Sequence, residues 1–133
     1  MTDKLEYPPL YLQGIEYFNA CDFFESHEAW EELWADEQGP ARKFYQGLIQ
    51  VAVALHHFGN GNLRGARKLY ASSRGYLEPY RPWYLGLDLE KFLLEFAQCF
   101  SAILDSPEAF PRLEIEPDLI PEIHLEPAGK TAG

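Results

Sequence analysis

The sequence predicts an all-α protein, a compact bundle of about five helices with an extended Pro-rich C-terminal tail. Apolar residues recur at spacings of three and four through most of the first 105 residues, and Gly, Pro and Asn clusters separate the successive runs. Half of the 10 prolines fall after residue 105, where a long helix cannot form. We therefore expect a helical domain over residues 1–105 and an extended acidic Pro-rich tail over residues 106–133.

The first two helices are expected before Gly39-Pro40. Pro8 and Pro9 are typical of the start of a helix, and apolar residues follow as far as Phe18. Asp22 is a candidate N-cap, with Glu25 three residues later as in a capping box. A strong second helix is predicted from Phe23 to about Ala35.

The third predicted helix, from about Ala41 to Phe58, is apolar nearly all round, which indicates a central, buried element. Its short connection through Gly39-Pro40 predicts that it lies antiparallel to the second helix. Asn62 is the candidate N-cap of a fourth helix, and Asp88 that of a fifth helix reaching about Leu104.

The tail keeps a substantial number of apolar residues among its prolines and carboxylates. A fully disordered segment would contain fewer of them. We expect an extended segment, up to about Leu125, that packs on the helices or on a partner.

Charge and composition exclude several classes of function. The formal net charge is −10 and the isoelectric point about 4.7, so nucleic acid and anionic membrane surfaces are not expected as partners. The longest apolar stretch, around Gly47 to Phe58, is shorter than the roughly 20 residues of a membrane span. Cys21 and Cys99 lie far apart and indicate reduced thiols in a cytoplasmic protein, although one bridge remains open.

The second helix places polar groups inside its apolar arc. At about 100° per residue, His27 and Glu31 fall among Phe23, Trp30 and Trp34, and are expected to be buried there. A buried carboxylate without a partner is unfavourable, so another element must supply a partner for Glu31.

The third helix offers such partners. Gln46, Gln50 and His57 project along one stripe, and small neighbours such as Gly47 would let another helix approach closely. We expect this stripe to converge with His27 and Glu31 between the second and third helices. His56 points elsewhere and is the weaker candidate.

Two interpretations of this cluster remain open. In the first, His27, Glu31 and His57 bind a divalent metal, zinc or a first-row transition metal, with Glu28 as general base and Gln46 and Gln50 orienting substrate or water. In the second, the same residues form a structural polar network, as buried polar groups usually do. The protein would then be a non-enzymatic helical interaction module.

The metal motif matches no named class. The sequence from His27 to Glu31 resembles H-E-x-x-H, but Glu31 stands where the second histidine belongs. The paired E-x-x-H motifs of di-iron bundles are absent from the sequence. A small-molecule ligand and a homo-oligomer are both left open as partners.

Three motifs in order carry a family resemblance. They are the stretch Phe23–Trp34, the stretch Phe44–Gln50, and Gly61-Asn62-Leu63-Arg64-Gly65-Ala66. Together they resemble the domain-of-unknown-function 309 family, small helical proteins sometimes labelled predicted metal-dependent hydrolases. The resemblance covers roughly residues 15–105. It implies an all-helical fold and a site at His27, Glu28, Glu31, Gln46 and Gln50.

Overall fold

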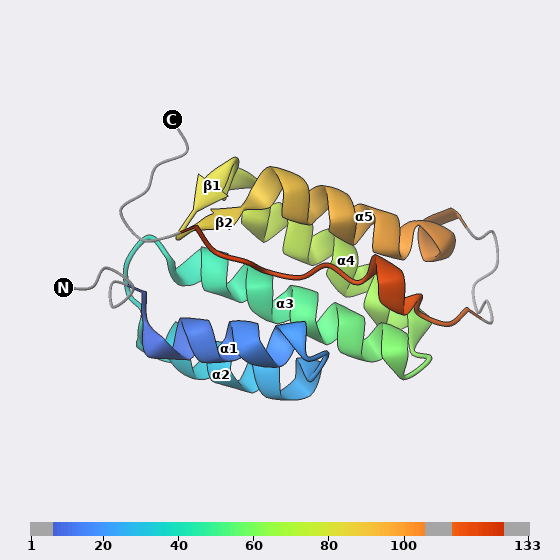
Figure 1. Cartoon of the computed structure of the whole chain (residues 1–133), viewed down its shortest axis with the longest axis horizontal. Coiled ribbons are helices and arrows are strands. Elements are labelled where there is room, and N and C mark those ends of the chain that lie inside the picture. The colour runs from blue at the N-terminus through green and yellow to red at the C-terminus, as the bar shows by residue number, and fades with distance from the viewer. Residues whose placement is uncertain (1–6, 106–112, 127–133) are drawn as a thin grey trace.

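A computed structural model of the chain describes residues 7–105 and 113–126 and confirms the all-α class (Figure 1). Its five α-helices are α1 (Pro9–Asn19), α2 (Phe23–Asp36), α3 (Arg42–Gly59), α4 (Leu63–Leu77) and α5 (Leu89–Asp105). A 3₁₀ turn (Glu78–Tyr80) and a hairpin of two short antiparallel strands, β1 (Trp83–Tyr84) and β2 (Leu87–Asp88), connect α4 to α5. Another 3₁₀ turn (Pro117–Leu119) interrupts the C-terminal segment.

Helices α1 and α2 approach each other closely at Gly14. A Cβ atom on Gly14 would overlap the indole ring of Trp30, which is fully buried. The Trp30 Nε1–H donates to the carbonyl oxygen of Tyr11 at 3.2 Å, and the Ser26 hydroxyl donates to that of Gly14 at 2.8 Å. The absence of a side chain at Gly14 therefore allows two polar groups of α2 to bind the backbone of α1.

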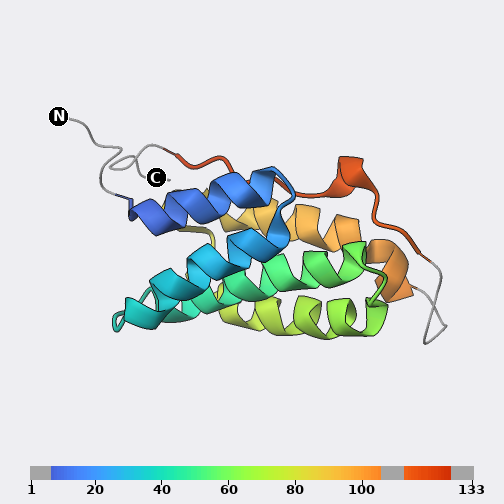
Figure 2. The same cartoon turned by 90° about the horizontal axis from the view of Figure 1, so that it is seen from below.

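Helix α3 is the central element of the bundle, as its apolar sequence predicts. It packs against α2 on one side and α4 on the other, and Figure 2 shows it between these two helices. Its buried residues include the large side chains of Phe44, Tyr45 and Leu48. The predicted antiparallel pairing of the second and third helices is confirmed.

Aromatic rings and arginines join α4 to α5. The ring of Tyr70 is stacked on that of Phe100, with centroids 5.0 Å apart, and lies 4.8 Å from that of Phe96. From α4, Arg67 donates to the carbonyl oxygen of Ile103 at 3.0 Å and Arg74 to that of Leu93 at 3.1 Å. These arginines therefore satisfy backbone acceptors of the neighbouring helix.

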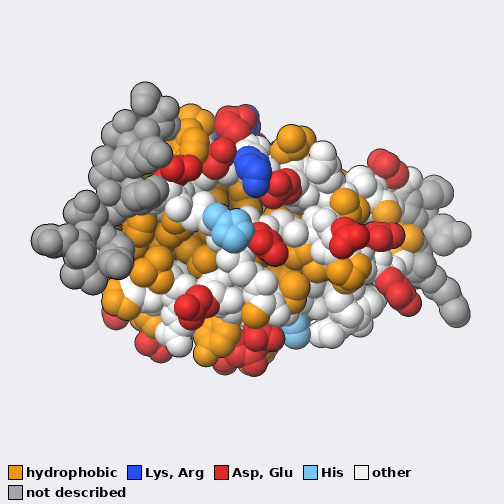
Figure 3. All heavy atoms as spheres, viewed as in Figure 1, with side chains coloured by type: hydrophobic (Ala, Val, Ile, Leu, Met, Phe, Trp, Pro, Cys, Tyr) orange, Lys and Arg blue, Asp and Glu red, His pale blue; other side chains and the backbone are white. Residues whose placement is uncertain are grey.

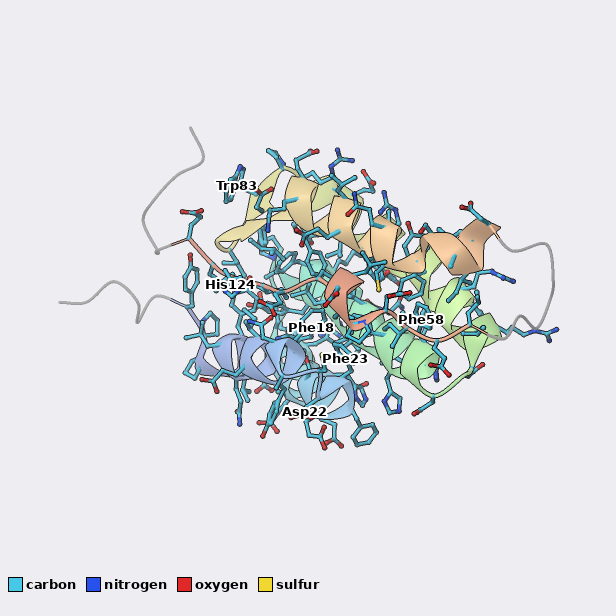
Figure 4. All side chains as sticks on the ribbon, turned by 45° about the vertical axis from the view of Figure 1, so that its right-hand side comes forward. Phe18, Asp22, Phe23, Phe58, Trp83 and His124 are labelled. Atoms are coloured by element: carbon cyan, nitrogen blue, oxygen red, sulfur yellow. The ribbon has the colours of Figure 1, made fainter. Side chains whose placement is uncertain are left out.

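The helix caps are partly as expected. Asn62 accepts from the backbone N–H of Gly65 at 3.1 Å, and Asp88 from that of Lys91 at 3.1 Å, so both predicted caps are confirmed. Asp22 occupies the N-cap position of α2 as predicted, but its side chain forms no capping hydrogen bond, so the expected capping box is not formed. Asp22 lies at the outer edge of the molecule in Figure 4, whereas Phe18 and Phe23 lie inside it, with ring centroids 5.2 Å apart.

The described part of the tail, residues 113–126, runs across the face between α1 and α5 (Figure 1). Asn19 of α1 exchanges two hydrogen bonds with the backbone of Ile123, both of 2.8 Å, and the Ile123 side chain is buried. The N–H of Glu126 donates to the carbonyl oxygen of Gly86 at 2.9 Å. The expectation of an extended segment packed on the helices is confirmed for residues 113–126. Residues 106–112 and 127–133 of the predicted tail lie outside the described residues.

Two further expectations concern membranes and thiols. Within the described ranges, no helix combines the length and the apolar character needed to cross a membrane.

Cys21 is exposed, Cys99 is buried and both are free thiols, so the bridge that the sequence left open is not formed.

Candidate functional site

His27 and Glu31 lie one turn apart on α2, but the burial predicted for them is not present. The side chain of Glu31 is 57% exposed and that of His27 is 17% exposed, with 3.9 Å between Nε2 and Oε1. Glu31 points out of the apolar arc because α2 rests on α1 and α3 through Phe23, Ser26 and Trp30. The expectation of a buried carboxylate is therefore wrong, and Glu31 needs no buried partner.

His27 is held by the first turns of its own helix. Its Nδ1 lies 2.6 Å from the carbonyl oxygen of Phe24, and because that oxygen can only accept, Nδ1 carries the proton. The imidazole also contacts the Phe24 ring edge-on, with centroids 5.0 Å apart. On its other side, Phe24 lies 5.8 Å from the ring of His56. His56, the weaker candidate from the sequence, is therefore the histidine of α3 that lies beside α2.

The stripe on α3 faces α4 at both of its ends. Gln46 donates from Nε2 to the hydroxyl of Tyr76 at 3.2 Å. A Cβ atom on Gly47, the small residue next to Gln46, would overlap Leu77 of α4. At the far end, His57 lies against Asn62, the N-cap of α4. The close approach predicted at Gly47 does occur, but with α4 in place of α2.

His57 supports the start of α4. Because the Oδ1 atom of Asn62 accepts from Gly65, its Nδ2 must be the donor in the 3.3 Å contact with Nδ1 of His57. The imidazole is therefore a neutral acceptor. Burial lowers the pKa of His57, and the nearby His56 lowers it further, which favours that neutral form.

The metal-ligand set does not assemble. His27 lies on α2 beside Phe24, whereas His57 lies on α3 against the N-terminus of α4. No group of three or more His, Cys, Asp and Glu side chains in the described ranges could hold a metal ion. His27, Glu31 and His57 consequently do not form one site in this structure, and their metal-binding role stays a prediction.

Glu28 lies along a different surface from the histidines. With Glu25 and Glu32 it lines a shallow pocket between α1 and α2, which also includes Leu10 and Tyr17. Glu28 is exposed. Its role as general base remains untested, and Gln46, a proposed substrate-orienting residue, binds a tyrosine of the protein itself.

Two buried polar atoms have no partner among the described residues. They are the Oε1 atom of Gln50 on α3 and the Nε1–H group of Trp34 on α2. Buried acceptors and donors are normally satisfied, so a water or ligand atom is the expected partner of each. Gln50 is thus a member of the predicted cluster with a buried acceptor atom that the described residues leave unbonded.

The residue that sequence reasoning missed is Arg42. Its guanidinium carbon lies 3.9 Å from the centroid of the Trp34 ring, and its Nη1 donates to the carbonyl oxygens of Trp34 and Glu37 at 2.8 and 3.0 Å. A cation here satisfies carbonyls at the C-terminal end of α2. The signal in the sequence was an arginine placed just after the Gly39-Pro40 connection.

Charged side chains on the surface are engaged in local pairs. Arg81 forms 2.8 Å contacts with both Glu78 and Glu90, and Arg74 lies 3.7 Å from Glu78. On the face shown in Figure 3, carboxylates are scattered widely, while lysine and arginine side chains are few. The surface is thus acidic on this face, in agreement with the net charge of −10.

These observations define a class of protein, a five-helix domain with locally bonded polar side chains on α2 and α3. Residues 11–69 match the family model described as "Domain of unknown function (DUF309)". Residues 11–69 are therefore similar to this family, in agreement with the resemblance that the motifs predict. The match covers α1, α2, α3 and the first half of α4.

Two relatives are similar to this chain. The uncharacterized protein YpuF of Bacillus subtilis (strain 168) is 36% identical over 108 residues, 78% of this chain and 62% of that protein. An uncharacterized protein of Aquifex aeolicus (strain VF5) is 44% identical over 53 residues, 38% of this chain and 16% of that protein. The chain thus spans less than two thirds of each relative.

Proposed function

We propose that this domain is a non-enzymatic, cytoplasmic helical interaction module in which the polar residues of α2 and α3 are structural. The observation that supports this function most directly is that His57 accepts a hydrogen bond from Asn62, the residue that caps α4. His27 and Gln46 likewise bind Phe24 and Tyr76 of the protein itself. Gln46 and His57 thus join α3 to α4, and His27 bonds within α2.

The metal-dependent hydrolase implied by the family resemblance requires a different arrangement. A catalytic zinc site takes three protein ligands and leaves one position open. His27 could bind an ion through Nε2 while its Nδ1 still donates to Phe24, but His57 would have to give up the hydrogen bond that its Nδ1 accepts from Asn62. The interaction module requires no such rearrangement.

The experiment compares three substitutions of His27 in metal-free and metal-supplemented protein. In His27→Asn, the side-chain amide can replace Nδ1 as donor to the Phe24 carbonyl but supplies no imidazole nitrogen. His27→Ala removes both the donor and the ring contact with Phe24. We expect His27→Ala to lower the free energy of unfolding by about 1–2 kcal/mol. His27→Asn should recover part of that loss, and His27→Gln, whose amide is one carbon further out, should recover less.

Metal content is the second readout. We expect protein purified without chelator to contain no stoichiometric zinc, manganese or iron, and chelator to leave its denaturation midpoint unchanged. If the parent bound a metal stoichiometrically and all three His27 variants lost it, the polar residues would be a metal site and the proposal would fail. Zinc-dependent stabilisation of the parent that is absent from His27→Asn would have the same meaning.

A further inference from the structure

A surface pocket of about 570 Å³ lies where the first turn of α3 meets the C-terminal end of α4 and the following 3₁₀ turn. This volume is in the range that small ligands occupy, roughly 300–1,000 Å³. Six residues line it: Lys43, Ser72, Gly75, Tyr76, Pro79 and Tyr80. None of them belongs to the predicted polar cluster, although Gln46 binds Tyr76.

The two tyrosine rings are held by residues around them. Tyr80 donates its hydroxyl to the carbonyl oxygen of Pro40 at 2.5 Å, and its ring packs edge-on against Phe44 with centroids 5.4 Å apart. Tyr76 is held by Gln46 and by close packing over Gly47. Because both rings are fixed within the free protein, a ligand would meet a preformed aromatic wall and would not have to order it.

Gly75 leaves the helix backbone accessible inside the pocket. A Cβ atom added at this position would meet no atom within 4 Å. Its neighbours in the pocket, Ser72 and Tyr76, lie one turn before it and directly after it on α4. A flat group can therefore lie against this part of α4 between Pro79 and the tyrosines.

The charge of the pocket is set by Lys43. This side chain is exposed and forms no ion pair with any residue in the described ranges. It lies in the first turn of α3, where the helix dipole favours negative charge. The neighbouring carboxylate of Glu78 is already engaged by Arg74 and Arg81. The pocket therefore offers an unpaired cation on a strongly acidic protein.

The hydroxyl of Tyr76 adds a hydrogen-bond donor. Its oxygen accepts from Gln46, which leaves its own O–H free to donate. Ser72 also lines the pocket and is a second residue with a hydroxyl group. Aromatic walls with a few convergent polar groups are the usual composition of a small-molecule site.

We infer that this pocket binds a small organic anion that consists of a flat ring and a single carboxylate or phosphate group. The ring would lie between Tyr76, Tyr80 and Pro79, and the anionic group would reach Lys43. This inference rests on the proposed function, because it names the class of small molecule that the interaction module would bind. The pocket's lining includes none of the predicted metal ligands His27, Glu31 and His57.

The test is a titration with naphthoate and with naphthamide, which share one ring system and differ in charge. Backbone amide chemical shifts of metal-free protein are followed for both compounds. We expect saturable shifts at Lys43, Gly75 and Tyr76, with naphthoate binding roughly fivefold more tightly than naphthamide, the gain that one exposed ion pair can give.

Matched variants separate the charge from the ring contact. Lys43→Gln should reduce the affinity for naphthoate to that for naphthamide and leave naphthamide binding unchanged. Lys68→Gln, which removes an exposed lysine of α4 that does not line the pocket, should change neither affinity. Gly75→Leu, which fills the open space over α4, should weaken both ligands while the helical circular dichroism stays that of the parent.

Three outcomes would overturn the inference. They are shifts that map to another face, equal affinity for the two compounds in the parent, and unchanged naphthoate binding in Lys43→Gln. Because the protein is kept metal-free, these results do not depend on whether His27 binds a metal. If the pocket binds neither compound, the proposed function is unaffected. If His27 binds a metal, the proposed function fails but the inference about the pocket is unaffected.

Discussion

The guanidinium of Arg42 lies over the indole ring of Trp34, with 3.9 Å between the guanidinium carbon and the ring centroid. The same group donates to two carbonyl oxygens at the end of α2. One residue thus links the end of α2 to the start of α3 through both a cation–π contact and backbone hydrogen bonds.

Replacement of Arg42 by lysine should be destabilising although the charge is kept. A single ammonium cannot cover the Trp34 ring and donate to two carbonyls as a planar guanidinium does. We expect Arg42→Lys to lower the free energy of unfolding by about 1–2 kcal/mol, measured by urea denaturation. The neighbouring Lys43→Arg is the control and should stay within about 0.5 kcal/mol of the parent. Equal denaturation midpoints for the parent and Arg42→Lys would contradict a structural role for the Arg42 guanidinium.

Two glycines in helices should respond in opposite directions to alanine. At Gly14 the new methyl group would overlap the Trp30 indole, so Gly14→Ala should destabilise the protein by about 2–3 kcal/mol. At Gly75 the methyl group meets open space, and Gly75→Ala should stabilise the protein by about 0.5–1 kcal/mol through helix propensity. Thermal unfolding of the two variants checks both signs, and a Gly14→Ala protein as stable as the parent would show that α1 can move away from α2.

His57 should make stability depend on pH. Burial lowers its pKa in the folded state below 6.5, so the unfolded chain binds the proton more tightly. Stability from this group is therefore fully present above about pH 6.5 and is lost as the pH falls through the folded-state pKa. His57→Asn keeps an acceptor for Asn62 but does not titrate. Between about pH 7 and pH 5 the parent should lose more stability than this variant, and parallel curves would show that His57 does not contribute.

The two hydrogen bonds between Asn19 and Ile123 should anchor the C-terminal segment to α1. Asn19→Ala removes both the donor and the acceptor, and Asn19→Asp removes only the donor. We expect the Ile123 amide to exchange with solvent much faster in Asn19→Ala and to keep part of its protection in Asn19→Asp. Hydrogen exchange followed by NMR measures this. Unchanged protection in Asn19→Ala would mean that the buried Ile123 side chain alone holds the segment.

The two thiols should differ in reactivity. Burial raises the pKa of Cys99 to about 12. Partial burial and the nearby carboxylates of Glu122 and Asp22 also raise the pKa of Cys21, but this thiol is exposed at the junction of α1 and α2. Reaction with a disulfide reagent at mildly alkaline pH should modify Cys21 quickly and Cys99 only after denaturation. Mass spectrometry of the native protein should show a single adduct at Cys21, and Cys21→Ser should abolish it. Rapid double modification would show that α5 opens readily.

The sequence by itself determined the helices, because their signals are local. Helical spacing of apolar residues, the prolines at the start of α1 and the caps at Asn62 and Asp88 act within one or two turns, and all are present in the structure. The central position of α3 also followed from its apolar surface. Three ordered motifs were sufficient to indicate the family.

Only the tertiary structure decided which partner each polar side chain meets. Projection of α2 placed Glu31 inside the apolar arc, whereas the packing of α2 through Phe23, Ser26 and Trp30 leaves its side chain 57% exposed. The stripe of Gln46 and His57 could face either neighbour of α3, and close packing of Leu77 on Gly47 placed it against α4. Helical periodicity is a property of the chain, whereas the rotation of one helix against another depends on how all the side chains fill the space between them.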